Sequence, residues 1–137
     1  MYPPELVAPI REDLVEAGFT ELLNAKEVDE AMSKEGTTLC VINSVCGCAA
    51  RNARPAAKIS VEMSDKKPTN LVTVFAGVDT EAVEQARKYA LPYPSSSPSI
   101  ALFKDGKLVH FLERHHIEGN TAEAIADNLS AAYTEFC

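Results

Sequence analysis

Short apolar runs separated by amphipathic segments dominate the hydrophobic pattern of the chain. Residues 38–43 (TLCVIN) and 70–77 (NLVTVFAG) are rich in β-branched and other apolar residues and have the length of buried strands. Residues 99–112 (SIALFKDGKLVHFL) contain Asp105-Gly106, a dipeptide typical of two-residue hairpin turns. The pattern therefore predicts two buried strands followed by a β-hairpin.

The segments between these strands carry helical signals. Asn24 followed by Glu27 has the spacing of a capping box, and Asp79 stands where it can cap a later helix. Pro55 falls inside the helix predicted for residues 48–63, so we expect that helix to be kinked. The predicted helices span approximately residues 9–18, 24–36, 48–63, 79–90 and 121–136.

The order of these elements predicts an α/β fold. Two leading helices precede a β-α-β-α-β-β-α core, in which the first two strands pair in parallel and the hairpin adds antiparallel strands. This order is the thioredoxin-like arrangement. Pro98 directly precedes the third strand, where that fold has a cis-proline facing its thiols, so we expect Ser97–Pro98 to be cis and to pack near Cys46.

Length and charge narrow the functional classes. The 137 residues suggest a single domain spanning 1–137, and a net charge of −7 without a basic stripe argues against nucleic acid or an anionic membrane as a partner. No apolar run has the length of a transmembrane helix, and the N-terminus lacks the pattern of a secretory signal. We therefore expect a cytoplasmic protein, in which four cysteines are not a disulfide framework.

The candidate chemistry lies in Cys46-Gly47-Cys48, directly after the first predicted strand. A thiolate is the nucleophile in disulfide exchange, and a helix N-terminus favours the thiolate. We assign Cys46 as the nucleophile and Cys48, in the first helical turn, as the thiol that displaces what Cys46 has captured. Gly47 is expected to supply backbone freedom between them. The small ring of a Cys-x-Cys disulfide indicates strain, and hence exchange with small thiols.

Other interpretations of the cysteines and histidines stay open. The Cys-Gly-Cys pair could be half of a metal site, but a second cysteine pair is absent and the adjacent His115 and His116 do not easily converge on one metal. No metal and no cofactor are expected. Cys40 is expected to be a buried, inert thiol, Cys137 an incidental terminal one, and the two histidines surface or loop-bonding residues.

Three basic residues follow the cysteine pair at helical spacing. Arg51, Arg54 and Lys58 could form a solvated face of the helix. They could also supply a positive field that lowers a cysteine pKa or holds an anionic thiol. We expect Arg51 and Arg54 to bind anionic substrates.

Several stretches closely resemble the bacilliredoxins, thioredoxin-like proteins with a Cys-Gly-Cys site. They are NSVCGCAARNARPA, YPSSSPSIALFKDGK, RHHIEG and the N-terminal MYPPELVAPIREDL. The resemblance implies removal of bacillithiol, a low-molecular-weight thiol used by some bacteria, from mixed disulfides on cytosolic proteins. It places the bacillithiol on Cys46 and makes Cys48 the resolving thiol. The family more often has glycine where this chain has Arg51.

The resulting hypotheses differ in partner. The leading one is a thiol–disulfide oxidoreductase acting on bacillithiolated or disulfide-bearing client proteins together with bacillithiol or a similar small thiol, with Ser97 and Pro98 pairing with the incoming chain. A general disulfide isomerase is the alternative within the same class. A metal-binding module that uses Cys46 and Cys48 is the alternative from another class.

Overall fold

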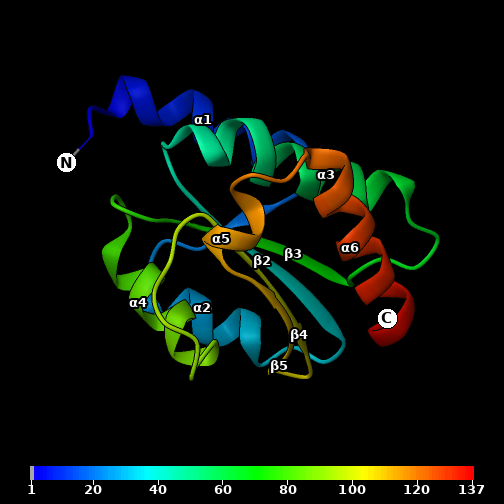
Figure 1. Cartoon of the computed structure of the whole chain (residues 1–137). Coiled ribbons are helices and arrows are strands. Elements are labelled where there is room, and N and C mark those ends of the chain that lie inside the picture. The colour runs from blue at the N-terminus through cyan, green and yellow to red at the C-terminus, as the bar shows by residue number, and fades with distance from the viewer. Residues whose placement is uncertain (1) are drawn as a thin grey trace.

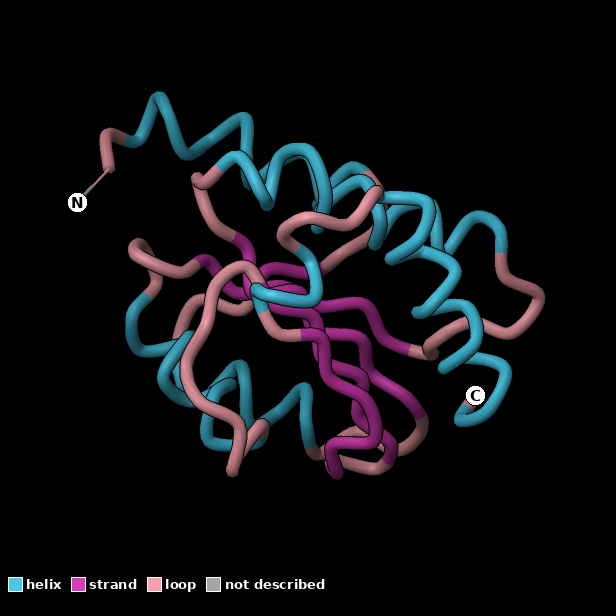
Figure 2. Tube along the Cα trace, viewed as in Figure 1, coloured by secondary structure: helices cyan, strands magenta, loops and turns pink. Residues whose placement is uncertain are grey.

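A computed structural model describes residues 2–137 and contains one five-stranded sheet with helices on both faces (Figure 1). Helices α1, α3 and α6 cover one face, and α2 and α4 cover the other (Figures 1 and 2). The strands are β1 (Thr20–Glu21), β2 (Thr37–Asn43), β3 (Asn70–Phe75), β4 (Ser99–Lys104) and β5 (Lys107–Leu112). The helical segments are α1 (Pro4–Glu16), α2 (Ala25–Met32), η1 (Ala49–Ala53), α3 (Arg54–Met63), α4 (Thr80–Tyr89), α5 (Arg114–Ile117) and α6 (Ala122–Phe136).

The sheet has the strand order β1-β3-β2-β4-β5. Strand β2 pairs in parallel with β3 and antiparallel with β4, and β4 pairs antiparallel with β5. This topology confirms the predicted thioredoxin-like fold. The two-residue β1, parallel to β3, was not predicted because it is too short to show a periodic pattern. Within residues 2–137, no helix is both long enough and apolar enough to span a bilayer.

Strand β2 lies at the centre of the sheet and is buried along all seven residues. Leu39 and Val41 belong to the core under α1, α3 and α6, whereas Cys40 and Ile42 belong to the core under α2 and α4. Side chains alternate between the faces of a strand, so a strand covered on both sides is apolar throughout. This arrangement explains the unbroken apolar run and holds the end of β2 firmly where the cysteine loop begins.

The local turn and cap signals identified two features correctly. The predicted hairpin turns at Asp105 and Gly106, whose φ angles of 51° and 80° lie in the left-handed region that a two-residue turn requires. Asn24 caps α2 by accepting the Glu27 N–H at 2.9 Å. The Glu27 carboxylate accepts the N–H of Leu23 at 2.7 Å, one residue before the cap.

The predicted start of the first helix and the predicted capping bond of Asp79 were wrong. The first helix begins at Pro4 rather than near Pro9, which lies inside it. A proline fits best in the first helical turn, and Pro4 occupies that place. Asp79 stands at the N-cap of α4 but makes no capping bond, because its carboxylate binds the Arg11 guanidinium through contacts of 2.7 and 3.0 Å.

The predicted kink near Pro55 takes the form of a widened turn. Residues Ala49–Ala53 form a π-helical segment in which the N–H of Arg54 donates to the Ala49 carbonyl, five residues back. In a regular α-helix the ring of Pro55 would clash with the carbonyl of Arg51, and its missing N–H would leave a hydrogen bond unmade. The wider turn directly before Pro55 accommodates the ring, and the helix continues to Met63.

Replacement of Leu129 by alanine should destabilise the fold strongly. Leu129 on α6 is 0% exposed within the core shared with β2 and α3. Loss of its side chain leaves a cavity, and we expect the free energy of unfolding to fall by about 2–5 kcal/mol in urea titrations. The matched control is Leu6→Ala on α1, where Leu6 is 48% exposed, and its effect should be below about 0.5 kcal/mol. Equal losses in the two variants would contradict this account of the core.

Candidate active site

The two cysteines of the Cys-Gly-Cys motif lie where β2 ends and the next helix begins. The Cys46 carbonyl accepts the N–H groups of Ala49 at 3.0 Å and Ala50 at 3.2 Å, so Cys46 stands at the start of a helix whose first residue is Gly47. Cys46 and Cys48 are free thiols and both are half-buried. The predicted position of the pair at a helix N-terminus is therefore confirmed.

The surroundings make the two thiols unequal acids. Burial opposes ionisation of Cys46, but the backbone N–H groups of Ala49 and Cys48, the Cys48 thiol and the charge of Arg114 outweigh it and lower the pKa of Cys46. Burial raises the pKa of Cys48, and the neighbouring Cys46 and the Glu118 carboxylate raise it further. The arrangement thus favours a thiolate on Cys46 and a thiol on Cys48.

Arg114, the first residue of α5, is a site residue that the sequence did not reveal. Its Nη2 lies 4.0 Å from the Cys48 sulfur, its Nη1 donates to the Ser97 carbonyl at 3.4 Å, and its Nε donates to Glu118 at 3.0 Å. Its only signal in the sequence is its place in the RHHIEG stretch, directly before the two histidines. A single cation therefore connects the thiols with the loop before β4.

Arg51 lies beside the cysteine pair, as expected. A Cβ on Gly47 would lie 2.7 Å from Arg51 Nη2, so the side chain of Arg51 folds over Gly47. Gly47 does not have a left-handed φ in this structure, where both thiols are free, and its role in bringing the two sulfurs together stays a prediction. Within residues 2–137, Arg51 forms no ion pair with a carboxylate.

Arg54 does not lie on the same face as Arg51. Its side chain is 8% exposed, and its guanidinium binds Asp13 at 3.2 Å and both the Asn43 side chain and the Ser44 carbonyl at 3.0 Å. These contacts fix the loop between β2 and Cys46 from its buried side. They leave little of the Arg54 guanidinium for an external ligand, which corrects the expectation that Arg54 binds substrate. Lys58 also pairs with Asp13, at 2.6 Å.

Asn43 and Ser44 fix the backbone that leads into Cys46. The Asn43 side-chain oxygen accepts the Ser44 N–H at 2.8 Å, and the Ser44 hydroxyl accepts the Cys46 N–H at 3.1 Å. Both residues are buried. Short polar side chains directly after an apolar strand are typical of such local backbone bonds, and this signal could have identified them from the sequence.

The segment before β4 has the predicted cis bond. Ser97–Pro98 is cis, which confirms that prediction, and Leu91–Pro92 is a second cis bond that was not predicted. Pro98 is buried and Ser97 is half-buried. Arg114 joins the Ser97 carbonyl to the Cys48 sulfur, so this segment and the thiols share one side of the molecule.

The remaining candidate residues have structural roles or lie apart from the thiols. The backbone N–H of Glu113 donates to His116 Nδ1 at 3.0 Å within a capping box at the start of α5, and His115 Nε2 lies 3.9 Å from a Glu113 carboxylate oxygen. The ligand atoms of these three residues lie within 4.8 Å of one another, closer than expected for adjacent histidines. Cys40 is buried, and burial raises its pKa to about 12, whereas Cys137 is exposed.

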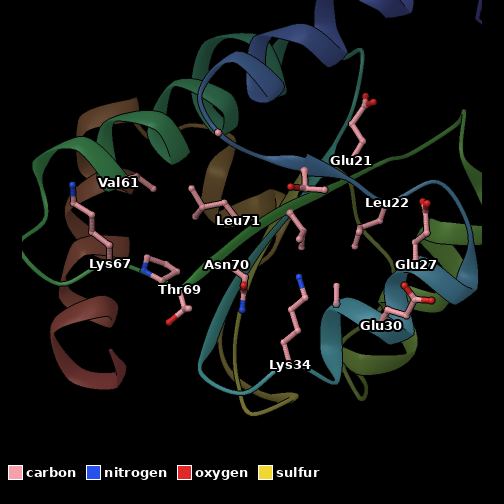
Figure 3. Close-up of a pocket in the computed structure, with 15 residues that line it drawn as sticks. Glu21, Leu22, Glu27, Glu30, Lys34, Val61, Lys67, Thr69, Asn70 and Leu71 are labelled. Carbon is pink, nitrogen blue, oxygen red and sulfur yellow. The ribbon is translucent and has the colours of Figure 1, made fainter.

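A groove of about 550 Å³ lies at another part of the molecule and contains none of the thiols. It exists because the two residues of β1 pair with Val72 and Thr73, so the first residues of β3 have no partner on that side. Figure 3 shows Glu27 and Glu30 on α2 at one side of the groove and Lys67 across it. The groove is therefore separate from the two thiols at the helix N-terminus.

Comparisons with known proteins show the family and the fold of the chain. A family model described as disulphide isomerase matches residues 2–137. A bacilliredoxin from Cytophaga hutchinsonii is 60% identical over 135 residues, which cover 98% of this chain and 99% of that protein. A bacilliredoxin from Halalkalibacterium halodurans is 55% identical over 137 residues, covering 99% of this chain and 94% of that protein.

Solved thioredoxins share the fold at low sequence identity. A mutant thioredoxin from Halobacterium salinarum matches with a TM-score of 0.58 and 20% identity, covering 88% of this chain and 95% of that chain. The oxidised thioredoxin from Plasmodium falciparum matches with a TM-score of 0.57 and 18% identity, covering 85% of this chain and 99% of that chain. The family-model match and the near-complete matches to the two bacilliredoxins show that the chain belongs to the bacilliredoxin family.

Proposed function

We propose that this protein is a thiol–disulfide oxidoreductase that removes bacillithiol from mixed disulfides on other proteins. The observation that carries the proposal is the position of Cys46 at a helix N-terminus, where N–H groups, the Cys48 thiol and Arg114 favour its thiolate. A half-buried thiolate with a second thiol beside it is suited to exchange with an incoming disulfide. Membership of the bacilliredoxin family supports bacillithiol as the thiol that is removed.

The first step is attack by the Cys46 thiolate on the bacillithiol sulfur of the client's mixed disulfide. The new bond joins Cys46 to bacillithiol, and the client cysteine leaves as a thiolate and takes a proton from solvent. We expect the backbone of Ser97, in the half-buried segment before β4, to pair with the incoming chain during this step. In this step Cys46 is oxidised to a mixed disulfide and the client cysteine is reduced to a thiol. The step does not require Cys48.

The second step is attack by Cys48 on the sulfur of Cys46. Cys48 loses its proton to solvent, forms the Cys46–Cys48 disulfide and expels bacillithiol as a thiolate. Two protein thiols have then been oxidised to one disulfide, and the client's mixed disulfide has been reduced to two thiols. A small external thiol can replace Cys48 in this step, in which case it takes the bacillithiol and regenerates Cys46.

A general disulfide isomerase is the second candidate, and the description of the matching family model favours it. Isomerisation needs the same nucleophile but acts on disulfides within a client rather than on bacillithiol adducts. Incubation with a protein of scrambled disulfides and with a bacillithiolated protein, at equal concentrations, compares the two activities directly. Faster recovery of the scrambled protein would favour the isomerase.

A metal-binding module based on Cys46 and Cys48 is the candidate from another class. Within residues 2–137, the only group of three or more potential ligands found close together is formed by Glu113, His115 and His116, and it contains neither cysteine. Metal analysis of the reduced protein, purified without added metal, tests this alternative. Stoichiometric zinc or copper that is lost in the Cys46→Ser variant would favour it.

The two cysteines should differ in their variants. Cys46→Ser should abolish release of a bacillithiolated client, because the attacking thiolate is lost. Cys48→Ser should release client once per molecule and accumulate a bacillithiol adduct on Cys46, which intact mass spectrometry and peptide mapping detect. Both variants are made with Cys137→Ser, because Cys137 is exposed and could take up label. The Cys137→Ser protein is the control, and an adduct that accumulates in Cys46→Ser instead would show that the roles are reversed.

Arg51 should distinguish an anionic thiol from an uncharged one. Its guanidinium folds over Gly47 without a carboxylate partner, so it can pair with a carboxylate of bacillithiol. Arg51→Gln should slow release from a bacillithiol mixed disulfide roughly fivefold, as expected for one exposed charge contact, and leave a 2-mercaptoethanol mixed disulfide nearly unchanged. Lys26→Gln removes the same charge from a side chain that is 86% exposed on α2 and serves as the control. Equal slowing with both substrates would argue against substrate binding by Arg51.

A further inference from the structure

Arg114 contacts the sulfur of Cys48 and acts through its charge on Cys46, the two thiols that the proposed mechanism uses one after the other. Its Nη2 is 4.0 Å from the Cys48 sulfur, and its charge also acts on Cys46. Its other nitrogens are held by the Ser97 carbonyl at 3.4 Å and by Glu118 at 3.0 Å. These two contacts come from different segments, the loop before β4 and the end of α5, and keep the guanidinium beside the thiols although its side chain is 47% exposed.

We propose that Arg114 is a catalytic residue whose charge favours the Cys46 thiolate before the first exchange and the Cys48 thiolate after Cys46 has been capped. The proposal rests on the sequential use of the two thiols in the proposed function. It gives one cation a role in both steps, without movement of the backbone.

Capping of Cys46 removes a negative charge that opposes ionisation of Cys48, as the proposed role of Arg114 requires. While Cys46 is a thiolate, its negative charge and that of Glu118 both oppose ionisation of Cys48. When Cys46 forms a mixed disulfide, its negative charge disappears and Arg114 no longer neutralises it. Arg114 then faces Cys48 as the nearest sulfur that can ionise, and the attacking thiolate forms only once Cys46 has something to release.

Glu118 sets how strongly Arg114 acts. The carboxylate accepts Arg114 Nε at 3.0 Å, which leaves Nη1 and Nη2 directed to Ser97 and Cys48. The same carboxylate raises the pKa of Cys48, whereas Arg114 lowers it. The pair therefore positions the cation and also restrains Cys48 before the first exchange.

The other positively charged side chains near the thiols are not held against a cysteine sulfur as Arg114 is. Arg51, from η1, lies over Gly47 on the helix that carries the cysteines, and Arg54 is bound to Asp13 behind the loop. Arg114 and Glu118 are the charged groups that α5 contributes to the two thiols. Variants at positions 114 and 118 therefore test the proposal without changing the helix that carries the cysteines.

The test measures the two steps separately and without bacillithiol, in the full chain with Cys137→Ser. The first measurement is the pH dependence of alkylation of Cys46 by iodoacetamide, quantified by peptide mapping. For the second, Cys46 is capped in acid with one equivalent of methyl methanethiosulfonate, which forms an uncharged methyl disulfide and releases methanesulfinate. A jump to higher pH then lets Cys48 expel methanethiol, and intact mass follows formation of the internal disulfide.

Arg114→Gln should raise the midpoint of both pH profiles. Loss of the positive charge lowers the fraction of each thiol that is ionised at neutral pH, and the greater nucleophilicity of the more basic thiolate offsets part of this loss, so each rate at neutral pH should fall roughly three- to fourfold. Arg114→Lys should retain most of both rates. Glu118→Gln should lower the midpoint for expulsion of methanethiol and accelerate that step. Lys26→Gln and Glu30→Gln, which break an exposed pair of the same i,i+4 spacing on α2, should change neither profile.

Several results would overturn the proposal. A shift of only one midpoint in Arg114→Gln would mean that Arg114 serves a single sulfur, and failure of Arg114→Lys to restore the rates would indicate a purely structural role. Salt provides a measurement that needs no variant, because screening of the exposed Arg114 should raise the Cys46 midpoint in the parent protein, and a constant Cys46 midpoint would contradict the proposal. If the parent protein performs both steps but does not release bacillithiol from clients, the proposed substrate is wrong and the role of Arg114 still stands.

Discussion

The buried guanidinium of Arg54 is the constraint on which the site depends. It binds Asp13 of α1, the Asn43 side chain at the end of β2 and the Ser44 carbonyl, and it is itself the first residue of α3. A buried charge is costly unless its donors are satisfied, so these segments stabilise one another only in this arrangement. Because Ser44 in turn holds the Cys46 N–H, the network fixes where the first thiol begins its helix.

A few local charges control ionisation in a protein whose net charge is −7. The N–H groups of a helix N-terminus act on Cys46 only, whereas Arg114 acts on both thiols and Glu118 acts on Cys48. The asymmetry between two cysteines separated by a single residue thus comes from the different hydrogen bonds and charges that act on each sulfur. Cys40 lies in β2, away from these charges, and burial raises the pKa of its thiol to about 12.

Features with local causes could be predicted from the sequence, and features with distant causes could not. The turn at Asp105-Gly106, the cap at Asn24 and the cysteines before a helix each depend on neighbouring residues. The contact between Arg114 and Cys48 joins residues 66 positions apart, and that between Arg54 and Asp13 joins residues 41 apart. No periodic pattern marks such contacts, and α5, with four residues, is too short to produce one.

The π-helical segment lets Arg51 and Arg54, three residues apart, point in different directions. Its extra residue per turn rotates α3 relative to the first turn, so that Arg51 faces solvent over Gly47 while Arg54 points into the protein. One residue corresponds to about 100° of rotation in a helix. The number of residues between the cysteine pair and Arg54 is therefore constrained as tightly as their identity. A related sequence that kept both but gained or lost one residue between them would either lose the buried ion pair or turn its thiols away from α5.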